Sequence, residues 1–194
     1  TYGFGLLKDI NLGVGSSYEY WYPVEAFSMG DAIYFFADDG VHGAELWVTD
    51  GTESGTDIVK DVNAGEMDAL DETYIPSIAS IGSTIIFPAS DGTNGNEIWK
   101  TDGTEAGTSM ILDIRSGSLS SSPHSLFTFG SEVFFFADSG SGHSLWKTDG
   151  TSGGTSEVSS SGTIDNNCQY NHRNCLVEAG SSLYILAQTE MYEY

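Results

Sequence analysis

Three aspartates recur in one short sequence context and are the first residues to consider as ligands for a metal ion. Asp50, Asp102 and Asp149 each stand in a Thr-Asp-Gly-Thr tetrapeptide, which gathers carboxylate, hydroxyl and carbonyl oxygens. Oxygen ligands of this kind suit Ca²⁺, although the spaced carboxylates of an EF-hand loop are missing. Asp-Gly between apolar runs is also a strong hairpin signal. We therefore expect these aspartates to form turns, with calcium binding as the alternative.

Other acidic and histidine side chains lack the arrangement that a shared site requires. Asp38 and Asp39, and the acidic run over residues 66–72, are candidates for cation binding at the surface, but nothing fixes a coordination sphere around them. The histidines share no common repeat position: they are His42, His124, His143 and His172. The chain carries no Gly-x-Ser-x-Gly elbow, no His-Glu-x-x-His and no phosphate-binding glycine loop. We predict no cofactor and no enzymatic activity, and a hydrolase that uses acidic residues is the third hypothesis for function.

Three tryptophans also recur at one repeat position. Trp47, Trp99 and Trp146 each follow a Leu or Ile and precede the Thr-Asp-Gly-Thr turn. An aromatic ring in this place either stacks on a sugar or supplies a large apolar body between packed sheets. The apolar neighbour and the adjoining turn favour the second interpretation. We assign these tryptophans to the repeat framework, together with the turn residues Asp50, Asp102, Asp149, Gly51, Gly103 and Gly150.

Two cysteines lie close together in the last quarter of the chain. Cys168 and Cys175 have His172 between them. A structural zinc site needs four nitrogen or sulfur ligands, and only one histidine is nearby, so we predict a disulfide and keep zinc as the alternative. Paired cysteines, few lysines and arginines, and many glycines and serines indicate an extracellular or cell-surface protein.

The charge of the chain excludes several classes of partner. Its 194 residues include 28 acidic and 6 basic side chains, for a net charge of −22. Nucleic acids and anionic membrane surfaces would repel such a chain, whereas divalent cations or basic partners would screen it. No apolar run reaches the 18 residues of a membrane span. No signal peptide is visible, as expected of a mature or trimmed chain.

Two sequence blocks repeat along the chain at intervals of roughly 50 residues, a period typical of propeller blades. The block Glu45–Thr56 returns as Glu97–Thr108 and as Ser144–Thr155. A second block begins with Gly and ends with Ala, and its apolar run on both faces predicts a strand packed between two sheets. Its four copies are Gly30–Ala37, Gly82–Ala89, Gly130–Ala137 and Gly180–Ala187.

The order of the blocks predicts an all-β fold, a four-bladed β-propeller of four-stranded antiparallel blades in a single domain over residues 1–194. The blades cover about 20–65, 74–117, 123–160 and 164–194. The fourth repeat, in which Glu190 replaces Glu45, ends before its last strand, while residues 4–11 match a last strand with no repeat before it. This N-terminal strand would complete the fourth blade and leave no open sheet edge.

The N-terminal strand also offers a route to assembly. Within one molecule it closes the ring, and between molecules it completes the fourth blade of the next copy and generates a fibre. The sequence leaves both alternatives open. The residues that would make this contact are Gly5, Leu6, Leu7 and Ile10.

The block Glu-Leu-Trp-x-x-Asp-Gly-Thr-x-x-Gly-Thr resembles the repeats of very long secreted and cell-surface proteins, mostly bacterial. The resemblance covers nearly the whole chain, strongly in the first two repeats and weakly in the last. It implies a role in adhesion, matrix or surface structure. Our leading hypothesis is thus a non-enzymatic extracellular structural or adhesive module that binds copies of itself. The alternative is a carbohydrate-binding propeller that uses single aromatics at the blade edges, such as Trp21, Tyr22 and Tyr170.

Overall fold

The structure, a computed structural model, describes residues 6–12, 26–70, 77–158 and 176–185 and contains only β-strands as regular elements in them. Three antiparallel four-stranded sheets follow one another along the chain, each with its strands in sequence order. The first holds β1 (Phe27–Met29), β2 (Ala32–Asp38), β3 (Ala44–Thr49) and β4 (Asp57–Ile58). The second holds β5 (Ala79–Ile81), β6 (Thr84–Ser90), β7 (Asn96–Thr101) and β8 (Ser109–Leu112). The third holds β9 (His124–Phe129), β10 (Glu132–Asp138), β11 (His143–Thr148) and β12 (Ser156–Glu157).

The described part of the fourth repeat forms a two-stranded sheet of β13 (Leu176–Ala179) and β14 (Ser182–Ile185). Its two strands follow one another around Gly180 as β1 and β2 do around Gly30. They therefore correspond to the first two strands of a complete sheet. The prediction of an all-β fold with four antiparallel strands per repeat is confirmed for three repeats.

The second block packs between sheets, as its apolar run on both faces predicts. On β6, Phe87 and Ile85 belong to the core shared with the first sheet, and Ile86 belongs to the core shared with the third sheet. All three side chains are almost fully buried. Because successive residues of a strand point to opposite faces, an unbroken apolar run supplies both cores at once. A third core lies between the third sheet and β13–β14 and includes Phe136, Leu145 and Leu176.

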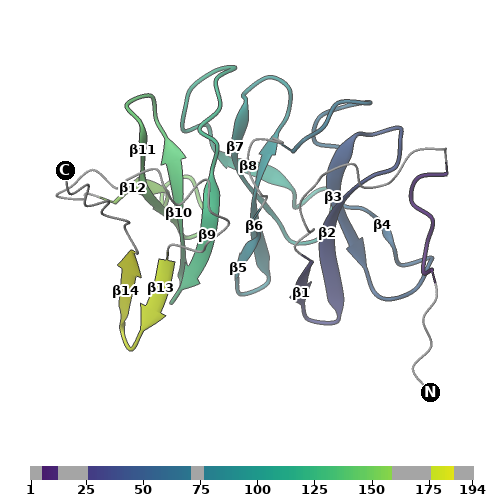
Figure 1. Cartoon of the computed structure of the whole chain (residues 1–194), viewed down its shortest axis with the longest axis horizontal. Coiled ribbons are helices and arrows are strands. Elements are labelled where there is room, and N and C mark those ends of the chain that lie inside the picture. Colours follow the sequence, from purple (N-terminus) through teal and green to yellow (C-terminus); the bar gives the residue numbers. More distant parts are fainter. Residues whose placement is uncertain (1–5, 13–25, 71–76, 159–175, 186–194) are drawn as a thin grey trace, which may run out of the picture.

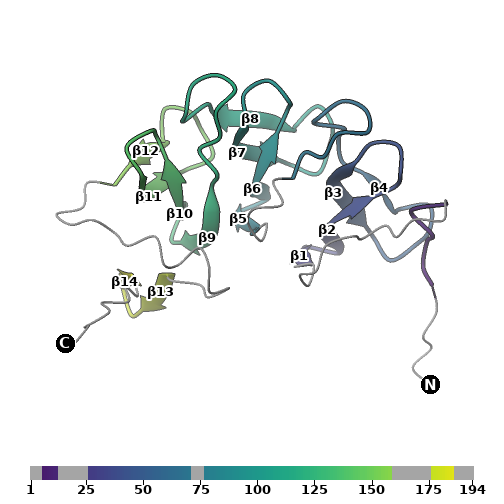
Figure 2. The same ribbon diagram turned by 45° about the horizontal axis from the view of Figure 1, so that its top comes forward.

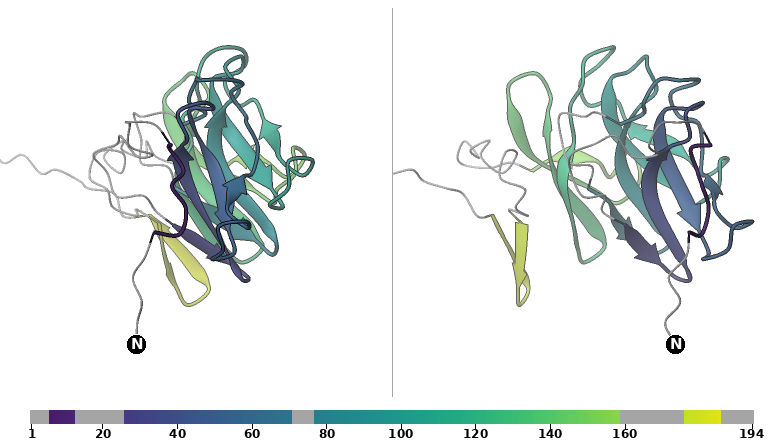
Figure 3. Two further views of the ribbon diagram at one scale, coloured as in Figure 1. Left: turned by 90° about the vertical axis from the view of Figure 1, so that its right-hand side faces the viewer. Right: turned by 45° about the vertical axis from the view of Figure 1, so that its right-hand side comes forward.

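The sheets are arranged along an arc, with β13–β14 at one end and residues 6–12 at the other (Figures 1 and 2). Residues 6–12 run beside the first sheet (Figure 3). They contain no strand, which differs from the predicted strand over residues 4–11. A strand is defined by backbone pairing with a neighbouring strand, and in the described residues no strand pairs with this segment. The described part of the chain also contains no helix long and apolar enough to cross a bilayer.

Candidate functional site

The repeated Thr-Asp-Gly-Thr block forms a turn that is held by hydrogen bonds within the block. In the first repeat, Asp50 Oδ1 accepts hydrogen bonds from the backbone N–H and the hydroxyl of Thr52, at 2.8 and 2.7 Å. The Thr56 hydroxyl donates to the carbonyl of Thr52, and the hydroxyl oxygens of Thr49 and Thr56 lie 2.6 Å apart. The second and third repeats reproduce these bonds around Asp102 and Asp149.

Some glycines of the block are required by their positive φ angle, and another is required because the aspartate carboxylate packs against it. Gly51, Gly103 and Gly150 have φ angles of 86°, 92° and 87°, which L side chains adopt at a cost. A Cβ on Gly55 would lie 2.1 Å from Asp50 Oδ1. The carboxylate is therefore packed against bare backbone, which explains the second glycine of the block.

These bonds account for the aspartates without a metal ion. Hydrogen bonds from the threonine side chain and backbone lower the pKa of Asp50, Asp102 and Asp149, so each carboxylate is ionised as a turn former. Among residues 6–12, 26–70, 77–158 and 176–185, no group of three or more His, Cys, Asp or Glu side chains could hold a metal ion.

The repeated tryptophans lie inside the protein. Trp47, Trp99 and Trp146 are 4%, 6% and 9% exposed. Trp99 of the second sheet packs in the core shared with the first sheet, and Trp146 of the third sheet packs in the core shared with the second. Each ring thus faces the preceding sheet. At Trp47 of the first sheet, the Lys8 ammonium lies over the ring, 5.7 Å from the centroid.

Several residues singled out from the sequence lie outside the described part of the chain. They are Gly5, Trp21, Tyr22, Cys168, Tyr170, His172, Cys175 and Glu190. The predicted disulfide, its zinc alternative and the aromatic candidates for sugar binding therefore stay predictions.

The most developed polar arrangement lies at the junctions between neighbouring sheets. At the first junction, Ala69 donates its N–H to the carbonyl of Ala44 at 3.1 Å and accepts from the N–H of Ser90 at 2.8 Å. At the second junction, Ser121 makes the same two bonds with Asn96 and Asp138. One residue in each linking segment therefore joins two sheets through its backbone.

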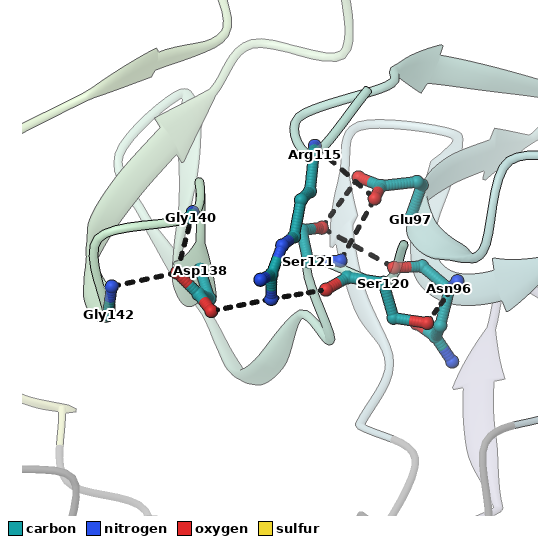
Figure 4. Close-up of polar contacts among 8 residues, drawn as sticks. All are labelled: Asn96, Glu97, Arg115, Ser120, Ser121, Asp138, Gly140 and Gly142. Carbon is teal, nitrogen blue, oxygen red and sulfur yellow. Dashed lines mark hydrogen bonds and ion pairs between the residues drawn. The ribbon is translucent and has the colours of Figure 1, made fainter. Parts of the chain in front are cut away.

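A buried glutamate lies beside each bridging residue. Glu97 is 0% exposed and accepts hydrogen bonds from the backbone N–H groups of Ile114, Arg115 and Ser121, at 2.9, 3.4 and 2.9 Å. The Ser121 hydroxyl donates to Glu97 Oε2 at 2.6 Å. The Arg115 guanidinium extends from the same place to Asp138 Oδ2 in the third sheet, at 2.8 Å (Figure 4). One carboxylate thus holds the end of β8 and the linking segment to β7.

The cations of the described residues also join sheets. The Lys60 ammonium donates to the carbonyl of Thr108 in the second sheet at 3.1 Å, and Lys100 donates to the carbonyl of Gly150 in the third at 2.9 Å. Lys147 pairs with Glu132 inside the third sheet. Every Lys and Arg of the described residues contacts a backbone carbonyl or a carboxylate, so basic side chains serve the framework here.

Residues 6–12 make contacts with the first sheet that match the contacts between the first and second sheets. The Lys8 ammonium donates to the carbonyl of Thr56 at 2.5 Å, as Lys60 does to Thr108. A Cβ on Gly40 would lie 3.2 Å from Asn11 Oδ1, and a Cβ on Gly92 would lie 2.5 Å from the amide oxygen of Asn63. The segment therefore occupies, against the first sheet, the place that the residues following β4 occupy against the second.

The first junction has fewer donors to its buried glutamate than the second. Glu45 is 1% exposed, and its Oε1 accepts from the N–H groups of Val62 and Asn63. Its Oε2 is buried without a hydrogen-bond partner among the described residues, because Ala69 stands where the second junction has Ser121. Burial raises the pKa of Glu45 to about 8, against the hydrogen bonds that lower it. Burial also raises the pKa of Glu97.

We expect Ala69→Ser to stabilise the protein by up to about 1 kcal/mol, because the new hydroxyl can donate to the partnerless oxygen of Glu45. The reciprocal change, Ser121→Ala, should destabilise it by about 1 to 2 kcal/mol because a donor to Glu97 is lost. Urea unfolding of both variants and the wild type measures the two effects. Changes of the same sign in both variants would contradict this account.

The raised pKa of Glu45 predicts a pH-dependent stability. Its ordinary pKa of 4.5 is below the folded value of about 8, so folding takes up a proton. The contribution of Glu45 is complete below pH 4.5 and is lost as the pH rises through 8. The glutamine of Glu45→Gln has no proton to lose. Between pH 4.5 and 8 the free energy of unfolding of this variant should therefore fall by on the order of 2 kcal/mol less than that of the wild type. The measurement is urea unfolding across this pH range, with Glu53→Gln at an exposed position as the control. Parallel pH curves for the wild type and Glu45→Gln would contradict the assignment.

Sequence reasoning assigned no role to the glutamate that opens the repeated block. A signal for it was present, since Glu45 and Glu97 are ionisable residues directly before an apolar pair in strands that must be buried. A buried carboxylate needs hydrogen-bond donors, and the backbone amides of the following strand supply them.

No family model matches this chain, and no curated protein matches it. Among solved structures, it is similar to an alpha-L-arabinofuranosidase from Clostridium thermocellum, with 12% sequence identity and a TM-score of 0.36. The match covers 84% of this chain and 59% of that chain.

Proposed function

We propose that this chain is a non-enzymatic extracellular structural module, a four-bladed β-propeller unit that assembles with copies of itself. The observation that carries the proposal is the docking of residues 6–12 on the first sheet. Lys8 contacts Thr56 as Lys60 contacts Thr108. The segment thus behaves as the outer strand of a sheet that precedes the first one.

The fourth repeat offers a place for this segment. β13–β14 correspond to the first two strands of a complete sheet, and Glu190 stands in the sequence where the first two repeats have the glutamate of their third strand. Residues 6–12 match the outer strands of the first two repeats in sequence. A sheet completed in this way has no free edge on the side of the donated strand.

The non-enzymatic and extracellular parts of the proposal have separate support. The repeated aspartates, glutamates and cations of the described residues are engaged in turns and junctions, so no reactive constellation is left among them. The paired cysteines, the excess of acidic side chains and the resemblance of the repeats to cell-surface proteins support an extracellular location. The carbohydrate-binding alternative depends on aromatics outside the described residues, and no observation in the described part favours it.

Light scattering of the purified chain over a concentration series tests the proposal. The mass should rise from 20.8 kDa with concentration. Salt or Ca²⁺ should promote the rise, because the net charge of −22 makes copies repel one another. A mass that stays at one chain under every ionic condition would refute assembly.

A further inference from the structure

Two histidines lie side by side on the third sheet, next to its contact with β13–β14. His124 begins β9 and His143 begins β11, and the centroids of their rings are 5.3 Å apart. The His124 ring also stacks on the ring of Phe136, with 5.6 Å between centroids. Phe136 packs with Leu176 of β13 in the third core, and β13 contacts β9. The histidine pair therefore adjoins the apolar contact that joins the fourth repeat to the third sheet.

The surroundings of the pair disfavour a positive charge. His124 is 5% exposed, and burial together with the neighbouring His143 lowers the pKa of His124 to about 4. Burial also lowers the pKa of His143; the Asp138 carboxylate opposes this change and the Arg115 guanidinium adds to it. Both imidazole rings are therefore neutral in the folded protein at pH 7.

Among the described residues, the carboxylate that acts on the pair is already engaged. Asp138 lies opposite His143 in the register of β10 and β11. It accepts from Arg115 at 2.8 Å and from the N–H groups of Gly140 and Gly142 at 2.7 and 2.9 Å (Figure 4). The remaining ionisable side chains of β9–β14 pair with each other or are exposed: Glu132 with Lys147, and Glu157, Glu178 and Tyr184. A proton on either imidazole would compete with Arg115 for Asp138.

The backbone around His124 is strained. Ser122 and Ser125 have φ angles of 48° and 55°, in the left-handed region that residues other than glycine adopt at a cost. The pairing of β9 with β10 also shifts its register between Phe134 and Phe136. Strain of this kind persists only while the surrounding packing holds it. A charge that weakens the packing of His124 would therefore also allow this strain to relax.

The described parts of the first two sheets have no such pair. Ala44 and Asn96 stand at the repeat position of His143. The first sheet instead has Glu45, whose raised pKa makes its contribution to stability largest at low pH. Acidification therefore acts on the first and third sheets in opposite directions.

We propose that mild acid opens the contact between β13–β14 and the third sheet through protonation of the buried pair His124 and His143, while the first three sheets stay together. The inference does not depend on the proposed assembly. Its sign follows from His124, whose pKa is 6.5 without this environment and about 4 within it. The open form thus binds the proton more tightly. The closed form is fully favoured above pH 6.5 and loses this advantage as the pH falls from 6.5 toward 4.

Hydrogen exchange of the full wild-type chain, read by mass spectrometry of its peptides, tests the inference. Between pH 7.5 and pH 5 the equilibrium constant for opening of β13–β14 should rise by about 10-fold or more, after correction for the intrinsic pH dependence of exchange. Peptides from β9 and β13–β14 should lose protection, and peptides from β5–β7 should keep it. Unchanged protection of β13–β14 would overturn the inference, as would an equal loss over β5–β7.

Variants that cannot titrate identify the trigger. His124→Phe keeps an aromatic ring to stack on Phe136, and His143→Asn takes the residue of the second repeat. The double variant should keep β13–β14 protected at pH 5. The control is His42→Gln, because His42 pairs with Asp39 in the first sheet, and this variant should open in acid as the wild type does. If the double variant opens as the wild type does, the histidines are not the trigger and the inference fails.

A titration of the wild-type imidazole signals by nuclear magnetic resonance keeps the test valid if the double variant misfolds. Two of the four histidines should titrate clearly below pH 6.5. Titration of all four at pH 6.5 or above would mean that the folded protein does not disfavour the charge on the pair, and the inference would be overturned.

Discussion

Glu97→Ala should lower the free energy of unfolding by about 3 kcal/mol or more, because four donors, two of them buried and two partly buried, lose the same acceptor together. Three are backbone N–H groups and one is the Ser121 hydroxyl. They belong to the end of β8 and to the linking segment before β9, so the loss affects the second sheet and its junction with the third. Thermal and urea unfolding of the full chain measure the effect.

Glu105→Ala is the matched control for this substitution. Glu105 is exposed in the turn after β7, eight residues further along the chain. The same change there should stay within about 0.5 kcal/mol. Similar effects of the two substitutions would mean that the buried carboxylate of Glu97 does not hold the junction.

Gly95→Ala should destabilise the protein by about 3 kcal/mol or more. Gly95 has a φ of +69°, and a Cβ at this residue would lie 2.5 Å from the carbonyl oxygen of Leu119. The methyl group would strain the backbone and displace the linking segment that carries Ser121. Urea unfolding measures the loss, which should exceed that of an ordinary surface change severalfold.

Gly82→Ala separates the cost of backbone strain from the cost of the clash with the linking segment. Gly82 has a similar φ of +59°, and a Cβ there meets nothing within 4 Å. It should cost only the backbone strain, about 1 to 2 kcal/mol. If Gly95→Ala cost no more than Gly82→Ala, the close approach of the linking segment to β7 would not contribute to stability.

The strands and turns of this fold could be predicted from the sequence because their signals are local. The Asp-Gly pair at Asp50 predicts a hairpin turn, and the apolar run at Gly82–Ala89 predicts a strand with two buried faces. Both signals depend on residues within one repeat, and three repeats carry them almost unchanged. The sequence also predicted that the tryptophans belong to the framework, because Trp47, Trp99 and Trp146 stand at one position of the repeated block.

The junction contacts could not be predicted in the same way because they join residues far apart in the chain. Lys60 and Thr108 are 48 residues apart, and Arg115 and Asp138 are 23 apart. Sequence alignment showed that residues 6–12 match an outer strand, but not that Lys8 and Asn11 would dock on the first sheet. The role of Glu45 and Glu97 depends on which backbone amides face the carboxylate, which only the arrangement of strands settles.

Lys8 and Lys60 contact carbonyls at the same distance along the chain, which has a consequence for how the gene can gain or lose repeats. Lys8 contacts a carbonyl 48 residues ahead, and so does Lys60, because equivalent residues of the first two repeats are in the same register. Unequal recombination between these repeats would remove or add one whole unit and join like to like. Each surviving sheet would meet a neighbour that offers the carbonyl, the glycine and the linking residue it needs. Loss or gain of one repeat would then leave the lysine contacts between neighbouring sheets intact.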